Sequence, residues 1–327
     1  MAKVLGIGNA LLDLLMTVPD DVLNELELAK GSMEMITEEK NKRILEVTKQ
    51  YPKMVVSGGS ASNCIHAIAH LGGDCTFQGK IGKDANGEAF SEDCKKSGIT
   101  PKLTVTDLAT GCANTFVTAD GERTFGTFLG AACTLGVDDI KSDIMKGMKL
   151  LHTEGYLIFN TDMFRKMMQT AKAEGVTISL DAGSFNIIND FKSFFDELLK
   201  DYVDIIFCNE EESEALTGLS DPYQAIDALA KLVKVPVVKL GKNGSLVKVD
   251  GKTVKVDIFK ADKIVDTTGA GDSYAGTFLA GWLRGIPEDK CAKAASFISS
   301  KVIQKMGAKL TEEQWAEYKV EVEKIFA

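Results

Sequence analysis

Seven consecutive residues from Asp266 to Asp272, Asp-Thr-Thr-Gly-Ala-Gly-Asp, combine two acids, two hydroxyl groups and two glycines. Gly269 and Gly271 lack a Cβ atom, so the backbone there can come close to a bound anion. The small and apolar residues from Ser273 to Leu283 predict a helix, whose first turn offers unpaired N–H groups and the positive end of the helix dipole. The amides of Gly269, Ala270 and Gly271 are therefore expected to form an anion-binding turn.

The last residue of this segment, Asp272, is unexpected beside an anion, because a carboxylate repels a phosphate group. A carboxylate in that position can instead accept the proton of an attacking hydroxyl group. Asp272 is therefore a candidate general base for phosphoryl transfer. A Gly-X-Gly turn alone is more often a simple chain reversal, and it is the density of acids and hydroxyl groups around the turn that favours a functional site.

The elements that must position this segment alternate along the chain. Apolar runs predict strands at residues 3–7, 54–56, 176–180, 203–208 and 235–240, and amphipathic patterns predict helices at residues 163–174 and 223–233. A glycine turn at residues 58–59 separates the second of these strands from a helix that ends near residue 71. Such alternation is typical of an α/β fold in which helices cover both faces of a mainly parallel sheet.

Two Asp-Gly pairs, at residues 120–121 and 250–251, lie between strand-like runs and predict tight hairpins. The first hairpin, together with residues 14–40, is expected to form a small β-sheet lid. We therefore predict a three-layer α/β/α domain made of residues 1–13, 41–100 and 130–327, and a lid made of residues 14–40 and 101–129.

The composition is that of a globular enzyme. The 327 residues are 45% hydrophobic, enough to fill a large core, and the net charge of −9 argues against nucleic acid or an anionic membrane surface as a partner. Seven cysteines are widely spaced without a Cys-X-X-Cys pair, which indicates reduced thiols and a cytoplasmic location. No apolar run approaches membrane-spanning length. We expect a small-molecule substrate and a monomer or homodimer.

A second candidate site follows the first predicted strand, in the run Gly-Asn-Ala-Leu-Leu-Asp at residues 8–13. The carboxylate of Asp13 can accept two hydroxyl protons at once, which suits the vicinal diol of a ribose or another furanose. The alternative is a solvated aspartate in a turn, but Asp13 is flanked on both sides by pairs of leucines. Asp13 is therefore a candidate for diol binding.

Four segments in order along the chain resemble the signatures of the ribokinase (PfkB) family of carbohydrate and nucleoside kinases. They are residues 57–63 (Ser-Gly-Gly-Ser-Ala-Ser-Asn), residues 209–212 (Asn-Glu-Glu-Glu), residues 239–245 (Lys-Leu-Gly-Lys-Asn-Gly-Ser) and residues 265–276 around Asp272. The resemblance implies the ribokinase-like fold, ATP as phosphate donor and Mg²⁺ as cofactor. It covers residues 5 to about 310.

The resemblance also assigns roles residue by residue. It implies that Asn9, Asp13, Gly58, Gly59 and Asn63 bind the sugar, and that Asn209, Lys239, Gly241, Gly244 and Thr268 lie on the nucleotide side. Glu212 and Asn209 would hold Mg²⁺ through water, and Asp266 and Thr268 would bind a monovalent cation such as K⁺. Arg123, just past the first hairpin turn, would fold over the transferring phosphate.

Within this family, the run at residues 8–13 resembles the adenosine kinases most closely, which implies phosphorylation of the 5′-hydroxyl of adenosine. Phe125, Leu129 and Tyr156 could then hold a purine by stacking or apolar contact, although each could equally belong to the core. The alternatives are a ribokinase- or fructokinase-like sugar kinase, and a binding protein that has kept the fold but lost the chemistry. The first shares every catalytic residue.

Overall fold

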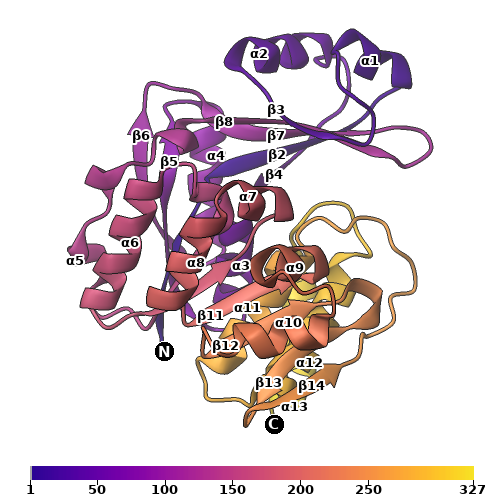
Figure 1. The fold of residues 1–327 in the computed structure, drawn as a ribbon. Coiled ribbons are helices and arrows are strands. Elements are labelled where there is room, and N and C mark those ends of the chain that lie inside the picture. Colours follow the sequence, from indigo (N-terminus) through magenta and orange to yellow (C-terminus); the bar gives the residue numbers. More distant parts are fainter. Residues whose placement is uncertain (1) are drawn as a thin grey trace.

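The computed structural model describes residues 2–327. Its core is a nine-stranded sheet (Figure 1) in the order β14 (Lys252–Val256), β13 (Ser245–Val249), β12 (Val235–Lys239), β11 (Ile205–Asn209), β10 (Thr177–Asp181), β9 (Leu150–Glu154), β1 (Lys3–Ile7), β5 (Asp74–Gly82) and β6 (Ile99–Thr106). The strands from β12 to β6 run parallel, and β13 and β14 are antiparallel. The predicted mainly parallel α/β sheet is confirmed.

Helices cover both faces of this sheet because consecutive strand residues point to opposite sides. Val4 packs with the cluster that contains helices α3 and α11, whereas Leu5 packs with the cluster that contains α6 and α8. The first face carries α3 (Ser60–His70), α4 (Ala85–Lys96), α11 (Ala270–Trp282) and α12 (Glu288–Val302), with α13 (Glu312–Phe326) packed on α12. The second carries α5 (Ser142–Met145), α6 (Thr161–Ala173), α7 (Phe185–Asp190), α8 (Lys192–Asp201), α9 (Glu210–Thr217) and α10 (Pro222–Leu229).

A second sheet of five strands lies above the carboxyl ends of the parallel strands (Figure 1). Its order is β3 (Met33–Met35), β8 (Arg123–Gly130), β7 (Thr110–Val117), β2 (Leu11–Thr17) and β4 (Met54–Gly58). Helices α1 (Asp20–Glu25) and α2 (Glu38–Val47) cover the face that points away from the large domain. The predicted small β lid is therefore present, and only three residues separate its strand β2 from β1 of the large sheet.

Three segments do not follow the predicted boundaries between the large domain and the lid. Two are strands that pair with the other sheet, and one is a helix. Strand β6, at residues 99–106, pairs with β5 in the large sheet, although residues 101–129 were assigned to the lid. Strand β4, at residues 54–58, pairs with β2 in the small sheet, so it does not form a βα unit of the parallel sheet with α3. Helix α2 also crosses the boundary at residue 40. Apolar periodicity reports which residues are buried and not which strand is the partner, so pairing was open to error.

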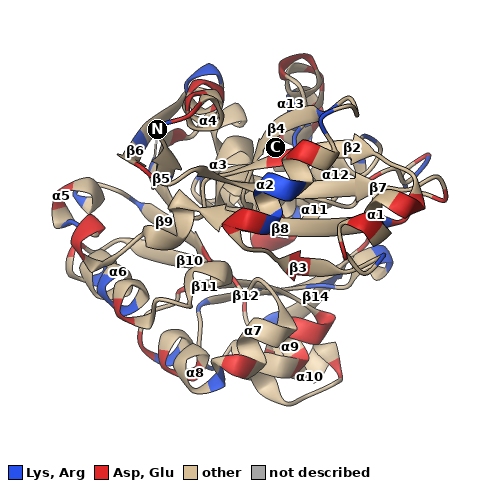
Figure 2. Cartoon of the chain, turned by 90° about the horizontal axis from the view of Figure 1, so that it is seen from above, with Lys and Arg blue, Asp and Glu red and all other residues tan. Residues whose placement is uncertain are grey.

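Both predicted hairpins are present, since Val117 lies opposite Arg123 and Val249 lies opposite Lys252. All seven cysteines in residues 2–327 are free, and six of them are buried. Charged side chains of both signs are interspersed over the outer helices (Figure 2). Within the described part of the chain, every helix is too short or too polar to span a membrane.

Candidate active site

Four adjacent parallel strands end in a polar residue at the edge that faces the small sheet. These last residues are Glu154 of β9, Asp181 of β10, Asn209 of β11 and Lys239 of β12. In an open parallel sheet, ligands bind outside the carboxyl ends of the strands. The fold therefore gathers these four side chains beside the segment that contains Asp272.

The predicted anion-binding turn forms the N-terminus of α11, which begins at Ala270. Gly269 has a φ of 74°, and a Cβ atom there would lie 2.4 Å from the Cβ of Ala308, so only glycine fits. A Cβ atom on Gly271 would lie 3.1 Å from the Nζ of Lys239. A cation therefore lies beside the turn, as a phosphate site requires, and within the turn the amide of Ala270 donates to the carbonyl of Thr267 at 3.2 Å.

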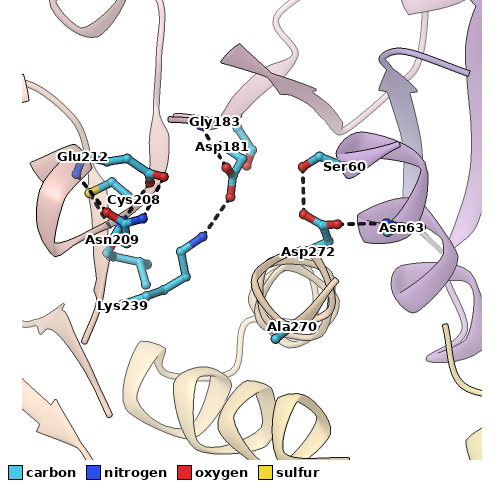
Figure 3. Close-up of polar contacts among 12 residues, drawn as sticks. Ser60, Asn63, Asp181, Gly183, Cys208, Asn209, Glu212, Lys239, Ala270 and Asp272 are labelled. Atoms are coloured by element: carbon cyan, nitrogen blue, oxygen red, sulfur yellow. Dashed lines mark hydrogen bonds and ion pairs between the residues drawn. The ribbon is translucent and has the colours of Figure 1, made fainter. Parts of the chain in front are cut away.

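Asp272 points toward Ser60 and Asn63 of the neighbouring helix α3 (Figure 3). Its carboxylate accepts hydrogen bonds from Ser60 Oγ at 2.8 Å and from Asn63 Nδ2 at 2.9 Å. Burial, together with the nearby Asp181, raises the pKa of Asp272 to about 6. The oxygen of the Asn63 amide, Oδ1, is buried and has no partner, so it can accept a hydrogen bond from a substrate hydroxyl group.

This environment predicts a pH dependence. Because the raised pKa means that Asp272 is protonated below about pH 6, kcat/KM should fall as the pH is lowered through that value. Burial also raises the pKa of Asp13 to about 7, so the two carboxyls should titrate together between about pH 6 and 7. Initial rates between pH 5 and 9 test this, with circular dichroism as the control for folding. A rate that stays constant down to pH 5 would contradict it.

Asp13 lies on β2 directly over Gly58, the last residue of β4. A Cβ atom on Gly58 would lie 2.6 Å from the carboxylate of Asp13, so the glycine makes room for it. Gly59 precedes the first residue of α3, and Asn63 lies in its first turn. Lys309, which binds Asp93 at 2.9 Å, attracts the charge of Asp13 and lowers its pKa against the effect of burial.

Asn9 is held by Glu154, a fully buried residue that we did not predict. Oε1 of Glu154 accepts hydrogen bonds from the backbone and the side chain of Asn9, at 3.1 and 2.8 Å, and Oε2 accepts one from the amide of Ala61 at 2.6 Å. Burial raises the pKa of Glu154 to about 7. Only Leu150 and Leu151 are apolar in the strand Leu150–Glu154, so the signal that a buried strand ends in this acid was weak.

The nucleotide side contains a second unpredicted acid, Asp181, which accepts an ion-paired hydrogen bond from Lys239 at 3.0 Å (Figure 3). Asn209 and Glu212 form a reciprocal cap on α9, in which Asn209 Oδ1 accepts from the amide of Glu212 and Glu212 Oε2 from the amide of Asn209, both at 2.8 Å. Burial and Asp181 raise the pKa of Glu212 to about 7. The two carboxylates thus repel each other, and a cation between them would relieve this.

A cavity of about 480 Å³ opens beside the anion-binding turn. Gly271 and Lys239 line it together with many apolar residues. Its lining includes Gly241, Gly244, Ile258, Phe259, Ile264 and Tyr274. A mostly apolar cavity that also contains part of the anion-binding turn and a lysine has the character of a site for an apolar ring that carries an anionic group.

A second cavity, of about 440 Å³, is lined by Asn9, Leu129 and Tyr156 among other residues. The hydroxyl group of Tyr156 donates a hydrogen bond to the carbonyl of Gly183 at 2.8 Å, so its ring is fixed. Phe159, which is 62% exposed, also lines this cavity. Leu129 and Tyr156 therefore line the same cavity, and the contact with a base that was predicted for them stays a prediction.

Phe125 does not line that cavity, because it lies four residues before Leu129, near the start of β8. Its neighbour Gly126 faces Ile44 of α2, where a Cβ atom would lie 3.3 Å from Ile44 Cδ1, so Phe125 points to the opposite face of the small sheet. Met33, which pairs with Phe125 from β3, and Met35, two residues further on, lie on the same face. Their side chains are 56% and 55% exposed. These two unpredicted methionines extend an apolar surface toward the large domain.

Arg123, the first residue of β8, contacts the segment that precedes the anion-binding turn. Its Nη1 donates to the carboxylate of Asp266 and, at 3.4 Å, to Thr268 Oγ1, and its Nη2 donates to the carbonyl of Val265 at 2.8 Å. The guanidinium thus binds the two residues to which the resemblance assigned a monovalent cation. The contact with the transferring phosphate that the resemblance implied for Arg123 stays a prediction, and the partner that the structure gives its guanidinium is the buried carboxylate of Asp266.

Residues 31–315 match the pfkB family of carbohydrate kinases. Adenosine kinase 2 of Arabidopsis thaliana is 26% identical over 328 residues, which cover 93% of this chain and 94% of that protein. The ribokinase of the same plant is 30% identical over 77% of this chain and 68% of its own length.

Two solved structures extend the comparison to the fold. The adenosine kinase of Sinorhizobium meliloti has a TM-score of 0.85 and 32% sequence identity, and the match covers 97% of this chain and 98% of that one. A probable sugar kinase of Rhizobium etli CFN 42 has a TM-score of 0.87 and 28% identity, over 98% and 99% of the two chains. The two-sheet architecture, the anion-binding turn and these matches lead to one conclusion, which is that the chain is a kinase and belongs to the pfkB family of carbohydrate kinases.

Proposed function

We propose that the protein transfers the terminal phosphoryl group of ATP to the 5′-hydroxyl of a nucleoside, with adenosine as its substrate. The observation that carries this proposal is that Asp272 directly follows the anion-binding turn and is hydrogen-bonded to two residues of α3. Gly271, the residue before Asp272, lines the cavity beside the turn. Ser60 and Asn63, the hydrogen-bond partners of Asp272, belong to α3, which begins beside Asn9 and Glu154.

In this mechanism the acceptor sugar binds through its vicinal diol to Asp13 and through a hydroxyl group to the free oxygen of Asn63. Asp272 accepts the proton of the 5′-hydroxyl as its oxygen forms a bond to the terminal phosphorus of ATP. The bond from that phosphorus to the bridging oxygen breaks, and ADP leaves with the electron pair. The amides from Gly269 to Gly271 and the ammonium of Lys239 stabilise the charge on the transferring group.

Mg²⁺ fits the acidic residues on the nucleotide side. The charge of Asp181 raises the pKa of Glu212, Lys239 already pairs with Asp181, and the amide of Asn209 donates to Glu212, so a cation bound here would face both carboxylates. Residues 2–327 contain no cluster of three or more acidic, histidine or cysteine side chains arranged to enclose a metal. This suits an ion that keeps its water and is bound mainly by the phosphates of ATP, where it would neutralise their charge. The free cysteines support a reducing compartment such as the cytoplasm.

A ribokinase- or fructokinase-like activity is the second candidate, because a ribokinase is among the relatives and the catalytic residues would be the same. The two activities differ in the use of the cavity lined by Leu129 and Tyr156. A nucleoside fills it with its base, whereas a free sugar leaves it empty.

We therefore predict that kcat/KM for adenosine exceeds that for ribose by about 10² or more, since burial of the base supplies binding energy that the chemical step can use. Release of ADP from ATP with Mg²⁺, measured against a panel of nucleosides and sugars, tests the prediction. Equal or higher kcat/KM for ribose or fructose would establish the sugar kinase instead.

Leu129→Ala provides a matched control, because it removes apolar surface from the base cavity alone. It should lower kcat/KM for adenosine about tenfold and leave that for ribose within about twofold, since the deleted methyl groups contact only a base. An equal loss with both substrates would mean that the variant disturbs the site in general, and the base would then have to bind elsewhere.

A further inference from the structure

The carboxylate of Asp266 is the junction of three segments. It is 1% exposed. One oxygen accepts a hydrogen bond from the amide of Thr268 at 2.8 Å, and the other accepts one from the amide of Gly307, also at 2.8 Å. Arg123 from the small sheet completes the set. Asp266 thus fixes the start of the anion-binding turn, ties it to the segment that precedes α13, and connects both to the small sheet.

The position of this carboxylate creates an electrostatic problem for a kinase. A buried charge is costly unless it is paired, and Asp266 lies only three residues before Gly269. An unpaired negative charge there would repel the phosphate that the turn is built to hold. Among the described residues, Arg123 is the one cation that forms a salt bridge with Asp266.

Two further sets of contacts hold the guanidinium of Arg123 in place. Nη2 of Arg123 donates to the carbonyl of Val265, so two of its nitrogen atoms contact the same short segment. The hairpin that precedes Arg123 is anchored at its tip, because Lys30 binds Asp120 at 2.7 Å and Asp20 at 2.5 Å. Arg123 is 15% exposed, which leaves its charge little screened by water.

We propose that Arg123 is a positioning residue that acts through Asp266 and does not bind the transferring phosphate itself. Its guanidinium neutralises the buried carboxylate and holds the start of the anion-binding turn in place. The side chain does for Asp266 and Thr268 what a dissolved alkali-metal ion would otherwise do, so the enzyme is independent of K⁺ and Na⁺. This proposal rests on the kinase activity proposed above. It adds that Arg123 neutralises the negative charge of Asp266 beside the anion-binding turn.

A double-mutant cycle separates this role from direct phosphate binding. Arg123→Ala should lower kcat by about 10², because it leaves a buried and unpaired carboxylate beside the phosphate. Adding Asp266→Asn removes that charge, so the double variant should recover about tenfold relative to Arg123→Ala. If Arg123 bound the phosphate directly, the double variant would be no more active than Arg123→Ala, and that result would overturn the proposal.

Small cations give a second readout that a purely structural role would not change. K⁺ or guanidinium at millimolar concentration should partly restore Arg123→Ala, because it can occupy the vacated position, and should leave the double variant unchanged. The wild-type enzyme should have the same kcat in K⁺ and in tetramethylammonium buffers. Activation of the wild type by K⁺ of fivefold or more would overturn the proposal, and this measurement requires no variant to fold.

The experiment also distinguishes the two levels of inference. The wild type is assayed first with ATP, Mg²⁺, adenosine and ribose, and the cycle is then run with whichever acceptor is used. A wild type that is inactive with every acceptor would refute the kinase activity and, with it, this proposal. An active wild type whose double variant shows no recovery would refute only the role of Arg123.

Discussion

Asp272→Asn should lower kcat by about 10³ and change KM for either substrate by less than about threefold. The amide has the same shape and can still contact Ser60 and Asn63, but it cannot accept a proton, so the loss falls on the transition state. Steady-state rates of ADP release, with both substrates varied, measure the two constants separately.

Asp190→Asn is the matched control, because Asp190 is an exposed aspartate at the end of α7 that lines neither of the two cavities. Its kcat should equal that of the wild type. If Asp272→Asn kept a tenth or more of wild-type turnover, a residue other than Asp272 would have to accept the proton.

Asp13→Ala should lower kcat/KM by about 10³ or more with every acceptor, because all of them present a diol and a site built around hydroxyl groups discriminates strongly when those bonds are lost. Asp13→Asn, which keeps one acceptor oxygen, should lose less. Parallel assays with adenosine and ribose measure whether the loss is common to both.

A substrate lacking the diol provides the corresponding control. The wild type should discriminate strongly against 2′,3′-dideoxyadenosine, whereas Asp13→Ala should treat adenosine and the dideoxy compound almost alike. If the variant still preferred adenosine by the wild-type factor, Asp13 would not be the diol ligand, and its closeness to Gly58 would be a packing contact only.

The sequence predicts those parts of the structure that depend on neighbouring residues. The hairpins at residues 120–121 and 250–251 and the turn at Gly269 follow from local backbone preferences, and each is present. Strands β4 and β6 were assigned to the wrong sheets because their partners, β2 and β5, are chosen by the path of the whole chain. The residues of a short apolar strand do not determine which other strand it pairs with.

The same distinction applies to the site. Asp272 and Asp13 belong to motifs that could be identified in one stretch of sequence. Glu154 and Asp181 act on residues far away in the chain, and only the parallel register of β9 and β10 brings them together. Arg123 was identified as functional, but its partner Asp266 lies 143 residues further on, and no local pattern indicates that pairing.

The two cavities draw on different amounts of the chain. The lining of the cavity beside the anion-binding turn comes entirely from residues 239–303, on the large domain. The second cavity is lined by Asn9, from the short connection between β1 and β2, and by Leu129, from β8 of the small sheet. Tilting the small sheet would therefore open the second cavity and leave the walls of the other one intact. If the protein has the activity proposed above, release of the phosphorylated acceptor should therefore depend on movement of the small sheet more than release of ADP does.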